Sequence, residues 1–100
     1  MYLVMFTARP KRATLQGRNT GGAYVNCWVN TKNRRLVEKM AQKHIEKSGW
    51  NVVSRQTKVK LVSRAKAEED QEMAERYVEA MERGGSYVFY CWPGKAQPAI

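Results

Sequence analysis

Residues 23–30 read AYVNCWVN, and apolar and polar or aromatic positions alternate along the whole stretch. The apolar side consists of Val25, Cys27 and Val29, and the other side consists of Tyr24, Asn26, Trp28 and Asn30. A period of two residues is that of a β-strand with one covered and one open face. We therefore place a half-buried strand here, and the rest of the chain has to supply the layer that covers its apolar side.

A second strand precedes this stretch. Tyr2–Ala8 is an unbroken apolar run with β-branched and aromatic members, which is typical of a short strand buried on both faces. Arg9-Pro10 ends the run. We expect the two strands to pair with each other across the intervening residues.

Those intervening residues, 9–22, read RPKRATLQGRNTGG and show neither a helical nor a strand period. Loops of this length are usually functional or mobile. One interpretation is a phosphate clasp made by Lys11, Arg12 and Arg18 with backbone amides around the glycines. The segment is not a P-loop, because it contains no Gly-Lys-Ser/Thr. The other interpretation is a mobile basic hairpin loop.

A first helix follows the strand at residues 23–30. Thr31 or Asn33 can cap its N-terminus, and Ser48-Gly49 stops it. Its predicted apolar stripe is made of Leu36, Val37, Met40, Ala41, His44 and Ile45. These positions recur at helical spacing, so this helix is expected to cover the sheet.

A second helix is predicted over residues 65–83, ending at Gly84-Gly85. The acids Glu68, Glu69 and Asp70 crowd its first turn, where the helix dipole favours negative charge. Its predicted buried stripe is made of Met73, Ala74, Tyr77, Val78 and Met81. Residues 50–62 read as one bent strand or two short ones, and residues 87–92 as a final strand.

The resulting order of elements is ββαβ(β)αβ. Strand–helix–strand connections are right-handed, so we expect both helices on one face of a mixed sheet of four to five strands. This α+β two-layer plait resembles the ferredoxin-like fold in element order, with an extra N-terminal strand. Residues 1–92 are expected to form a single domain, and residues 93–100 a loose tail.

The charge distribution is the strongest functional signal. Fifteen of the eighteen lysines and arginines lie in residues 1–66 beside only two acids, which gives this part a charge of +13. The remaining residues carry three bases and seven acids, or −4. Such an imbalance adds nothing to core stability, because like charges on one surface repel. It therefore indicates an anionic partner, either nucleic acid or an acidic protein.

The first helix concentrates part of this charge. Lys32, Arg34 and Arg35 lie at its predicted N-terminus, where the dipole penalises each cation by roughly a few tenths of a kcal/mol. Arg35, Lys39, Lys43 and Lys47 then follow at spacings of four along one side. A solvated helix face and an anion-binding ridge are the two interpretations of this pattern.

The open sheet face is a third candidate. Tyr24 and Trp28, together with Lys58 and Lys60, are expected to point away from the helices, joined by Trp92 from the last strand. Aromatic rings between lysines can stack bases and hold phosphates. The same surface is an equally natural homodimer interface.

Residues 83–90, RGGSYVFY, resemble in part the RNP1 octamer of RNA-recognition motifs. The basic residue, the first glycine, the valine and two aromatic positions match, whereas Gly85 and Ser86 depart from the pattern. The octamer also belongs on an inner strand after a hairpin, and here it follows a helix. We therefore do not assign the chain to that family.

No catalytic constellation is visible. His44, the single histidine, falls on the predicted buried stripe, so a satisfied histidine at the edge of the core is expected rather than a base or ligand. Cys27 and Cys91 lack metal-ligand spacing, and free thiols in a cytoplasmic protein are expected. No apolar run is long enough to span a bilayer. No metal or cofactor is predicted.

The sequence thus predicts a small non-enzymatic binding protein that engages an anionic partner, with nucleic acid favoured over acidic protein. The alternative is a homodimeric protein-interaction or regulatory module that binds no nucleic acid. Lys11, Arg12, Arg18, Lys32, Arg34, Arg35, Lys39, Lys43, Lys58 and Lys60 are the candidate anion-binding residues. Tyr24, Trp28 and Trp92 are the candidate stacking or dimer-interface residues.

Overall fold

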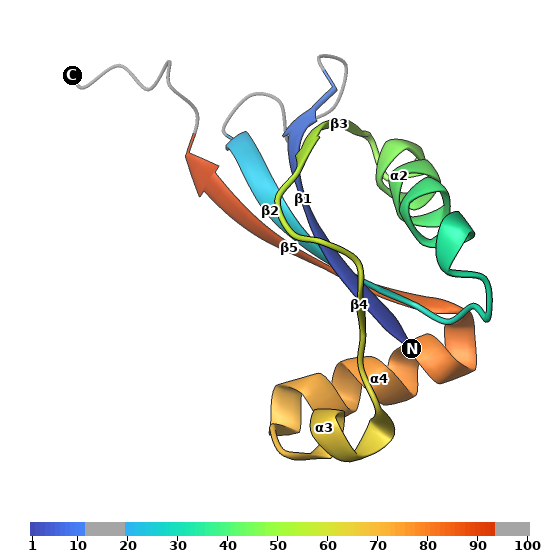
Figure 1. Ribbon diagram of the computed structural model, residues 1–100. Helices are drawn as coiled ribbons and strands as arrows, with labels where there is room; N and C mark the ends of the chain where they lie inside the picture. The colour runs from blue at the N-terminus through green and yellow to red at the C-terminus, as the bar shows by residue number, and fades with distance from the viewer. Residues whose placement is uncertain (12–19, 94–100) are drawn as a thin grey trace.

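The computed structural model describes residues 1–11 and 20–93 and contains one open sheet with helices on both faces (Figure 1). The strands are β1 (Tyr2–Pro10), β2 (Thr20–Val29), β3 (Trp50–Arg55), β4 (Lys60–Leu61) and β5 (Gly85–Pro93). The helical elements are the 3₁₀ turn η1 (Arg34–Leu36), α2 (Val37–Lys47), α3 (Arg64–Glu68) and α4 (Gln71–Arg83). The predicted α+β class is confirmed.

The sheet is entirely antiparallel, with the strand order β3-β1-β2-β5, and β4 pairs with the far end of β1 beyond β3. The predicted mixed sheet is therefore wrong. The predicted pairing of β1 with β2 is confirmed, with Tyr2 opposite Val29 and Ala8 opposite Ala23. Because β1 lies between β2 and β3, the connection through α2 joins two parallel strands that are not neighbours.

The two main helices cover opposite faces of the sheet. The core under α2 contains Val4, Phe6, Ala8, Ala23, Val25, Cys27, Val29, Val37, Ala41, Ile45, Trp50 and Val59. A second core under α3 and α4 contains Trp28, Val62, Ala67 and Ala80, with Met1, Leu3, Met73 and Tyr77 packed against it. In both β1 and β2 the two cores take alternate residues, which point to opposite faces.

The prediction that both helices lie on one face is consequently wrong. The handedness rule behind it governs connections between parallel strands. Here β5 runs antiparallel to β4, because α3 and α4 cross one end of the sheet and the chain then turns straight back. The handedness rule therefore does not decide which face of the sheet α4 covers. The apolar residues of α4 decide it, and they pack on the face that carries Trp28.

The helical segment made of η1 and α2 begins and ends at the predicted signals, although α2 itself has no side-chain cap. Asn33 caps η1 by accepting a hydrogen bond from the Arg35 backbone N–H, at 3.0 Å. Gly49 has a φ of 93°, a left-handed conformation that glycine adopts without strain. The buried stripe is narrower than predicted, since Leu36, Met40 and His44 are exposed.

The predicted helix over residues 65–83 is divided into two. Ser63 caps α3, and the Asp70 carboxylate accepts from the Met73 backbone N–H at 3.1 Å, which starts α4. A side chain that offers such a cap competes with a continuous helix. The predicted stripe also shifts, because Val78 and Met81 are exposed and Ala80 is buried instead.

Residues 50–62 form two short strands, one of the two predicted alternatives. The first predicted loop is bounded differently, since Arg9 and Pro10 belong to β1 and β2 begins at Thr20. Arg12 and Arg18 lie outside the described residues, as do residues 94–100 of the predicted tail. Within the described part, no helix is long and apolar enough to cross a membrane.

Candidate anion-binding surface

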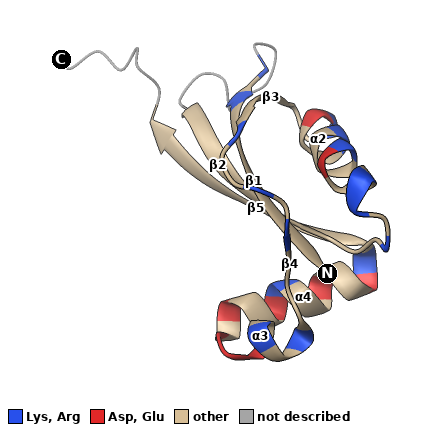
Figure 2. Cartoon of the chain, viewed as in Figure 1, with Lys and Arg blue, Asp and Glu red and all other residues tan. Residues whose placement is uncertain are grey.

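Cations gather on one side of the molecule, along η1, α2 and the segment that joins β3 to β4. Figure 2 shows most lysines and arginines there, and most acidic residues on α4 and at the junction of α3 with α4. The exposed basic residues of this surface are Lys32, Arg34, Arg35, Lys39, Lys43, Lys47, Lys58 and Lys60. We call this set the basic surface.

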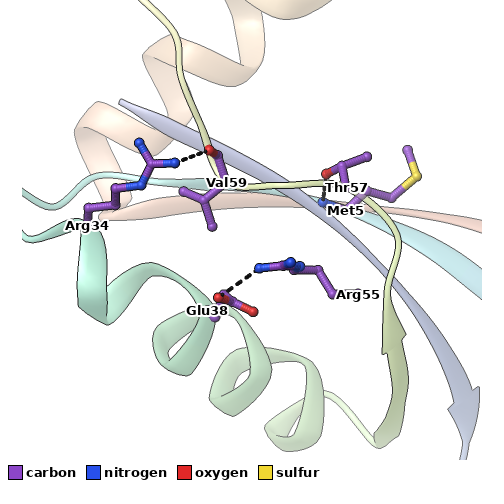
Figure 3. Close-up of polar contacts among 6 residues, drawn as sticks. All are labelled: Met5, Arg34, Glu38, Arg55, Thr57 and Val59. Carbon is purple, nitrogen blue, oxygen red and sulfur yellow. Dashed lines mark hydrogen bonds and ion pairs between the residues drawn. The ribbon is translucent and has the colours of Figure 1, made fainter.

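Two contacts fix the β3–β4 segment beside the start of α2 (Figure 3). An Arg34 Nη2 group donates to the Val59 carbonyl at 2.8 Å, and the Thr57 Oγ1 accepts from the Met5 backbone N–H at 3.0 Å. Val59 is buried in the α2 core, which anchors the segment further. Lys58 and Lys60 flank Val59 in the chain, so these contacts place both lysines near η1.

Acids neutralise little of the basic surface. Glu38 pairs with Arg55 at 3.2 Å, and both side chains are 43% exposed. The other ion pairs of the described residues join Arg64 to Glu68 and Lys66 to Glu69, both on or beside α3. Within residues 1–11 and 20–93, no member of the basic surface is therefore in an ion pair, and its positive field is left largely uncompensated.

A cleft of about 560 Å³ borders the basic surface where α2 approaches the start of β5. It is lined by Met40, Lys43, His44 and Lys47 of α2, by Glu79 and Arg83 of α4, and by residues 84–87. Three cations and one carboxylate give these walls a formal charge of +2 when His44 is neutral. The positions from α2 recur at spacings of three and four, so they form one stripe next to the buried one.

The floor of the cleft is aromatic. The His44 ring stacks on the Tyr87 ring, with centroids 3.7 Å apart and planes 8° from parallel. Burial, followed by the charge of Lys47, lowers the pKa of His44 below its ordinary 6.5. Burial raises the pKa of Tyr87 to about 12. Both rings are therefore uncharged near neutral pH, and the lysines and Arg83 supply the positive charge.

A hydrogen bond joins the end of α4 to β5 at the same cleft. The buried Ser86 hydroxyl donates to Glu79 Oε1 at 2.5 Å. This bond is the main cause that lowers the pKa of Glu79, with smaller contributions from Arg76 and Arg83. The Glu79 carboxylate therefore already has partners, which leaves Lys43 and Lys47 on the opposite wall free to meet an external anion.

The predicted aromatic surface is not assembled as expected. Tyr24 and Trp92 do meet, with ring centroids 5.1 Å apart and tilted planes. Trp28, however, is only 3% exposed beneath α3 and α4, so the prediction that it points away from the helices is wrong. Tyr24 and Trp92 lie on the sheet face opposite α2, so they do not share a surface with the lysines of α2.

Lys11 is the one cation of the predicted phosphate clasp that lies within the described residues, and it contacts α2. Its Nζ donates to the Glu46 carbonyl at 2.9 Å, near the C-terminus of α2 where the helix dipole favours a cation. Arg34 and Arg35 precede α2 instead of lying within it, and Glu38 occupies its first turn. The predicted conflict with the dipole is thus weaker than the sequence suggests.

The sequence-based candidates omit Arg83 and the cleft. The spacing of Met40, Lys43, His44 and Lys47 along α2 is a visible helical stripe that could have indicated the cleft's first wall. Nothing in the sequence indicates that the end of α4 approaches it. In the described part of the chain, no group of three or more His, Cys, Asp or Glu residues is placed to hold a metal ion.

Comparison with known proteins gives no functional lead for this surface. No protein-family model matches the chain, and neither the search of curated proteins nor that of solved structures found a significant match.

Proposed function

We propose that this protein binds an anionic macromolecule, with nucleic acid favoured, through the basic surface. The observation that carries the proposal is the set of exposed, unpaired cations on η1, α2 and the β3–β4 segment. A surface of this kind is unfavourable in isolation, because its charges repel one another. A polyanion would relieve that repulsion and release its own counterions.

The spacing of the cations favours nucleic acid over an acidic protein. Lys39, Lys43 and Lys47 recur every four residues, which corresponds to about 6 Å along the helix axis. Lys58 and Lys60 continue the charge beyond the start of α2. A regular, extended array of this type suits a chain of regularly spaced phosphates better than scattered carboxylates.

The test is a fluorescence-anisotropy titration with a labelled 20-nucleotide single strand of mixed sequence, as DNA and as RNA. If four phosphates are contacted, the slope of log K against log salt is roughly −2.8, so affinity falls about 50-fold between 50 and 200 mM salt. Poly-L-glutamate of similar length serves as a competitor. If it competes as well as the unlabelled oligonucleotide, the preference for nucleic acid is lost.

Two double variants of equal charge change test whether the basic surface is where the nucleic acid binds. Lys39→Gln with Lys43→Gln removes two charges from α2, whereas Arg64→Gln with Lys66→Gln removes the same charge from α3. We expect the α2 variant to weaken binding and to reduce the salt slope by about 1.4, since each lost phosphate contact contributes about 0.7. The α3 variant should bind nearly as the wild type. Equal losses would show that net charge, not the basic surface, drives binding.

A further inference from the structure

The outer edge of β5 is unpaired along its whole length in the described part of the chain, since β5 ends the strand order. The Asn30 backbone N–H donates to the Gly84 carbonyl at 3.0 Å. With the register of β2 and β5, this bond shows which residues of β5 hydrogen-bond to β2: Ser86, Val88 and Tyr90. Hydrogen-bonded pairs alternate in antiparallel sheets. The N–H and C=O groups of Tyr87, Phe89 and Cys91 therefore point to the open edge.

The two edges of the sheet differ in their protection. The opposite edge carries a bulge between Thr7 and Ala8, a break between β3 and β4, and three cations, Arg55, Lys58 and Lys60. Such features prevent strands of other chains from pairing. In contrast, β5 reads GSYVFYCWP, has no charged residue and has no proline before its last position. Apart from Pro93 and a register shift at the Thr20–Gly22 end of its ladder with β2, it lacks the usual features that keep an edge strand from pairing.

The cleft described above lies against this edge. It is lined by residues 85–87 at the start of β5, by α2 on one face of the sheet, and by Glu79 and Arg83 of α4 on the other. An added strand that pairs with β5 would therefore lie between the two helices. The backbone of the added strand could then form hydrogen bonds with the outward-facing N–H and C=O groups of Tyr87.

The other end of β5 is uncharged and exposed. In Figure 1 the final residues of β5 and the first of β2 project beyond both helices. Tyr24 and Trp92, near this end of the sheet, are 46% and 38% exposed, whereas the Tyr90 hydroxyl donates to Glu72 Oε1 of α4 at 3.1 Å. An uncharged strand can approach Lys43 and Lys47 without like-charge repulsion, which a basic segment could not do.

We propose that two copies of the chain pair antiparallel through β5, with the projecting end of each strand in the cleft of the other copy. Centring the pair on Phe89 places Tyr87 opposite Cys91 of the second copy and aligns the whole strand, although Pro93 at its end has no N–H to donate to the ladder. These odd-numbered residues are those whose backbone groups face the edge. An edge of nine residues is roughly 30 Å long, which gives the pair a continuous ladder over the full length of both strands.

The two-fold axis of this pair is perpendicular to the sheet, so both copies present the same face to the same side. The two α2 helices then lie on one face of a continuous sheet, and the two α4 helices on the other. The dimer brings the cations of both basic surfaces that lie outside the cleft to one face, away from the acidic helices, while Lys43 and Lys47 border the second copy. This consequence rests on the proposed function, whereas the pairing itself does not.

The test is analytical ultracentrifugation of the full chain at 1–100 μM, with reductant, 100 mM NaCl and no nucleic acid. The wild type is expected to show a concentration-dependent dimer. Cys91→Lys would place a cation beside Lys43 and Lys47 of the second copy, whereas Cys91→Glu would place an anion there. Both variants change the same exposed residue and remove the same thiol. We expect the dimer dissociation constant of Cys91→Lys to exceed that of Cys91→Glu at least tenfold.

Restoration completes the test. Lys43→Glu with Lys47→Glu should recover the dimer of Cys91→Lys. A wild type that stays monomeric at 100 μM, which would leave the edge to a strand of another protein, overturns the pairing. So do equal dissociation constants for the two Cys91 variants. A monomer that binds the oligonucleotide removes only the pairing, and a dimer that binds none removes only the proposed function.

Discussion

The imidazole of His44 lies flat on the phenol of Tyr87, with ring centroids 3.7 Å apart and planes 8° from parallel. This contact joins the exposed flank of α2 to the outer strand β5. It is the link between the helix that carries the basic surface and the strand edge that we propose as a dimer interface. Its strength and its response to pH therefore bear on both proposals.

A double-mutant cycle measures this contact. We expect the coupling between His44→Ala and Tyr87→Leu to be about 0.5–1.5 kcal/mol in the free energy of unfolding, the range for aromatic pairs. The cycle cancels the gain in helix propensity that alanine brings to α2. Urea denaturation of the four proteins gives the value. Additive effects of the two substitutions would mean that the rings do not stack in solution.

The lowered pKa of His44 predicts an acid-dependent loss of stability. Because the folded-state pKa lies below 6.5, the unfolded chain binds a proton that the folded chain does not. The stabilisation is thus fully present above pH 6.5 and is lost as the pH falls through the folded-state pKa. Urea denaturation at pH 7.5, 6.5 and 5.5 checks this. His44→Gln should lose less stability than the wild type over that range, and an identical loss in both proteins contradicts the assignment to His44.

The strands and the first helix were predictable from local patterns. The alternation of residues 23–30, the apolar run of Tyr2–Ala8 and the Asn33 cap each act over a few residues, and the structure follows them. The arrangement of α4 was not predictable in the same way. Its side of the sheet depends on the direction of β5 relative to β4, which is a long-range property of the chain.

The candidate site shows the same division. The exposed cations of α2 follow from helical spacing, because charged residues on a solvent-facing flank need no tertiary contact. Trp28 was misplaced because the alternation in β2 shows two faces but does not show that a second helix covers the aromatic one. The cleft requires Arg83 of α4 to approach Lys43 of α2, and no pattern within either helix contains that information.

The contacts around the β3–β4 segment are expected to contribute different amounts to the free energy of unfolding. Thr57→Val keeps the shape of the side chain but leaves the Met5 N–H without its acceptor, so we expect a loss of about 1–3 kcal/mol in the free energy of unfolding. Glu38→Gln removes an ion pair that is 43% exposed on both sides, and we expect about 0–1 kcal/mol. Urea denaturation ranks the two. Hydrogen exchange should also show lost protection at Met5 only in Thr57→Val, and the reverse ranking would contradict this account.

Replacing Gly84 or Gly22 by alanine should disturb the structure for two different physical reasons. Gly84 has a φ of 89° with no atom within 4 Å of the position of a Cβ, so Gly84→Ala is expected to cost about 1–2 kcal/mol through backbone strain alone. At Gly22 the strain is absent, but a Cβ would overlap the Trp92 ring and lie 2.9 Å from the Ala8 carbonyl oxygen. Gly22→Ala must therefore displace Trp92 from Tyr24, which tryptophan emission and near-ultraviolet circular dichroism would detect.

Gly84→Ala should leave both spectra unchanged while it lowers stability, because its effect is confined to the end of α4. If Gly22→Ala keeps the wild-type spectra, the Trp92 ring does not rest on Gly22, and the shape of the projecting end of β5 would have to be revised.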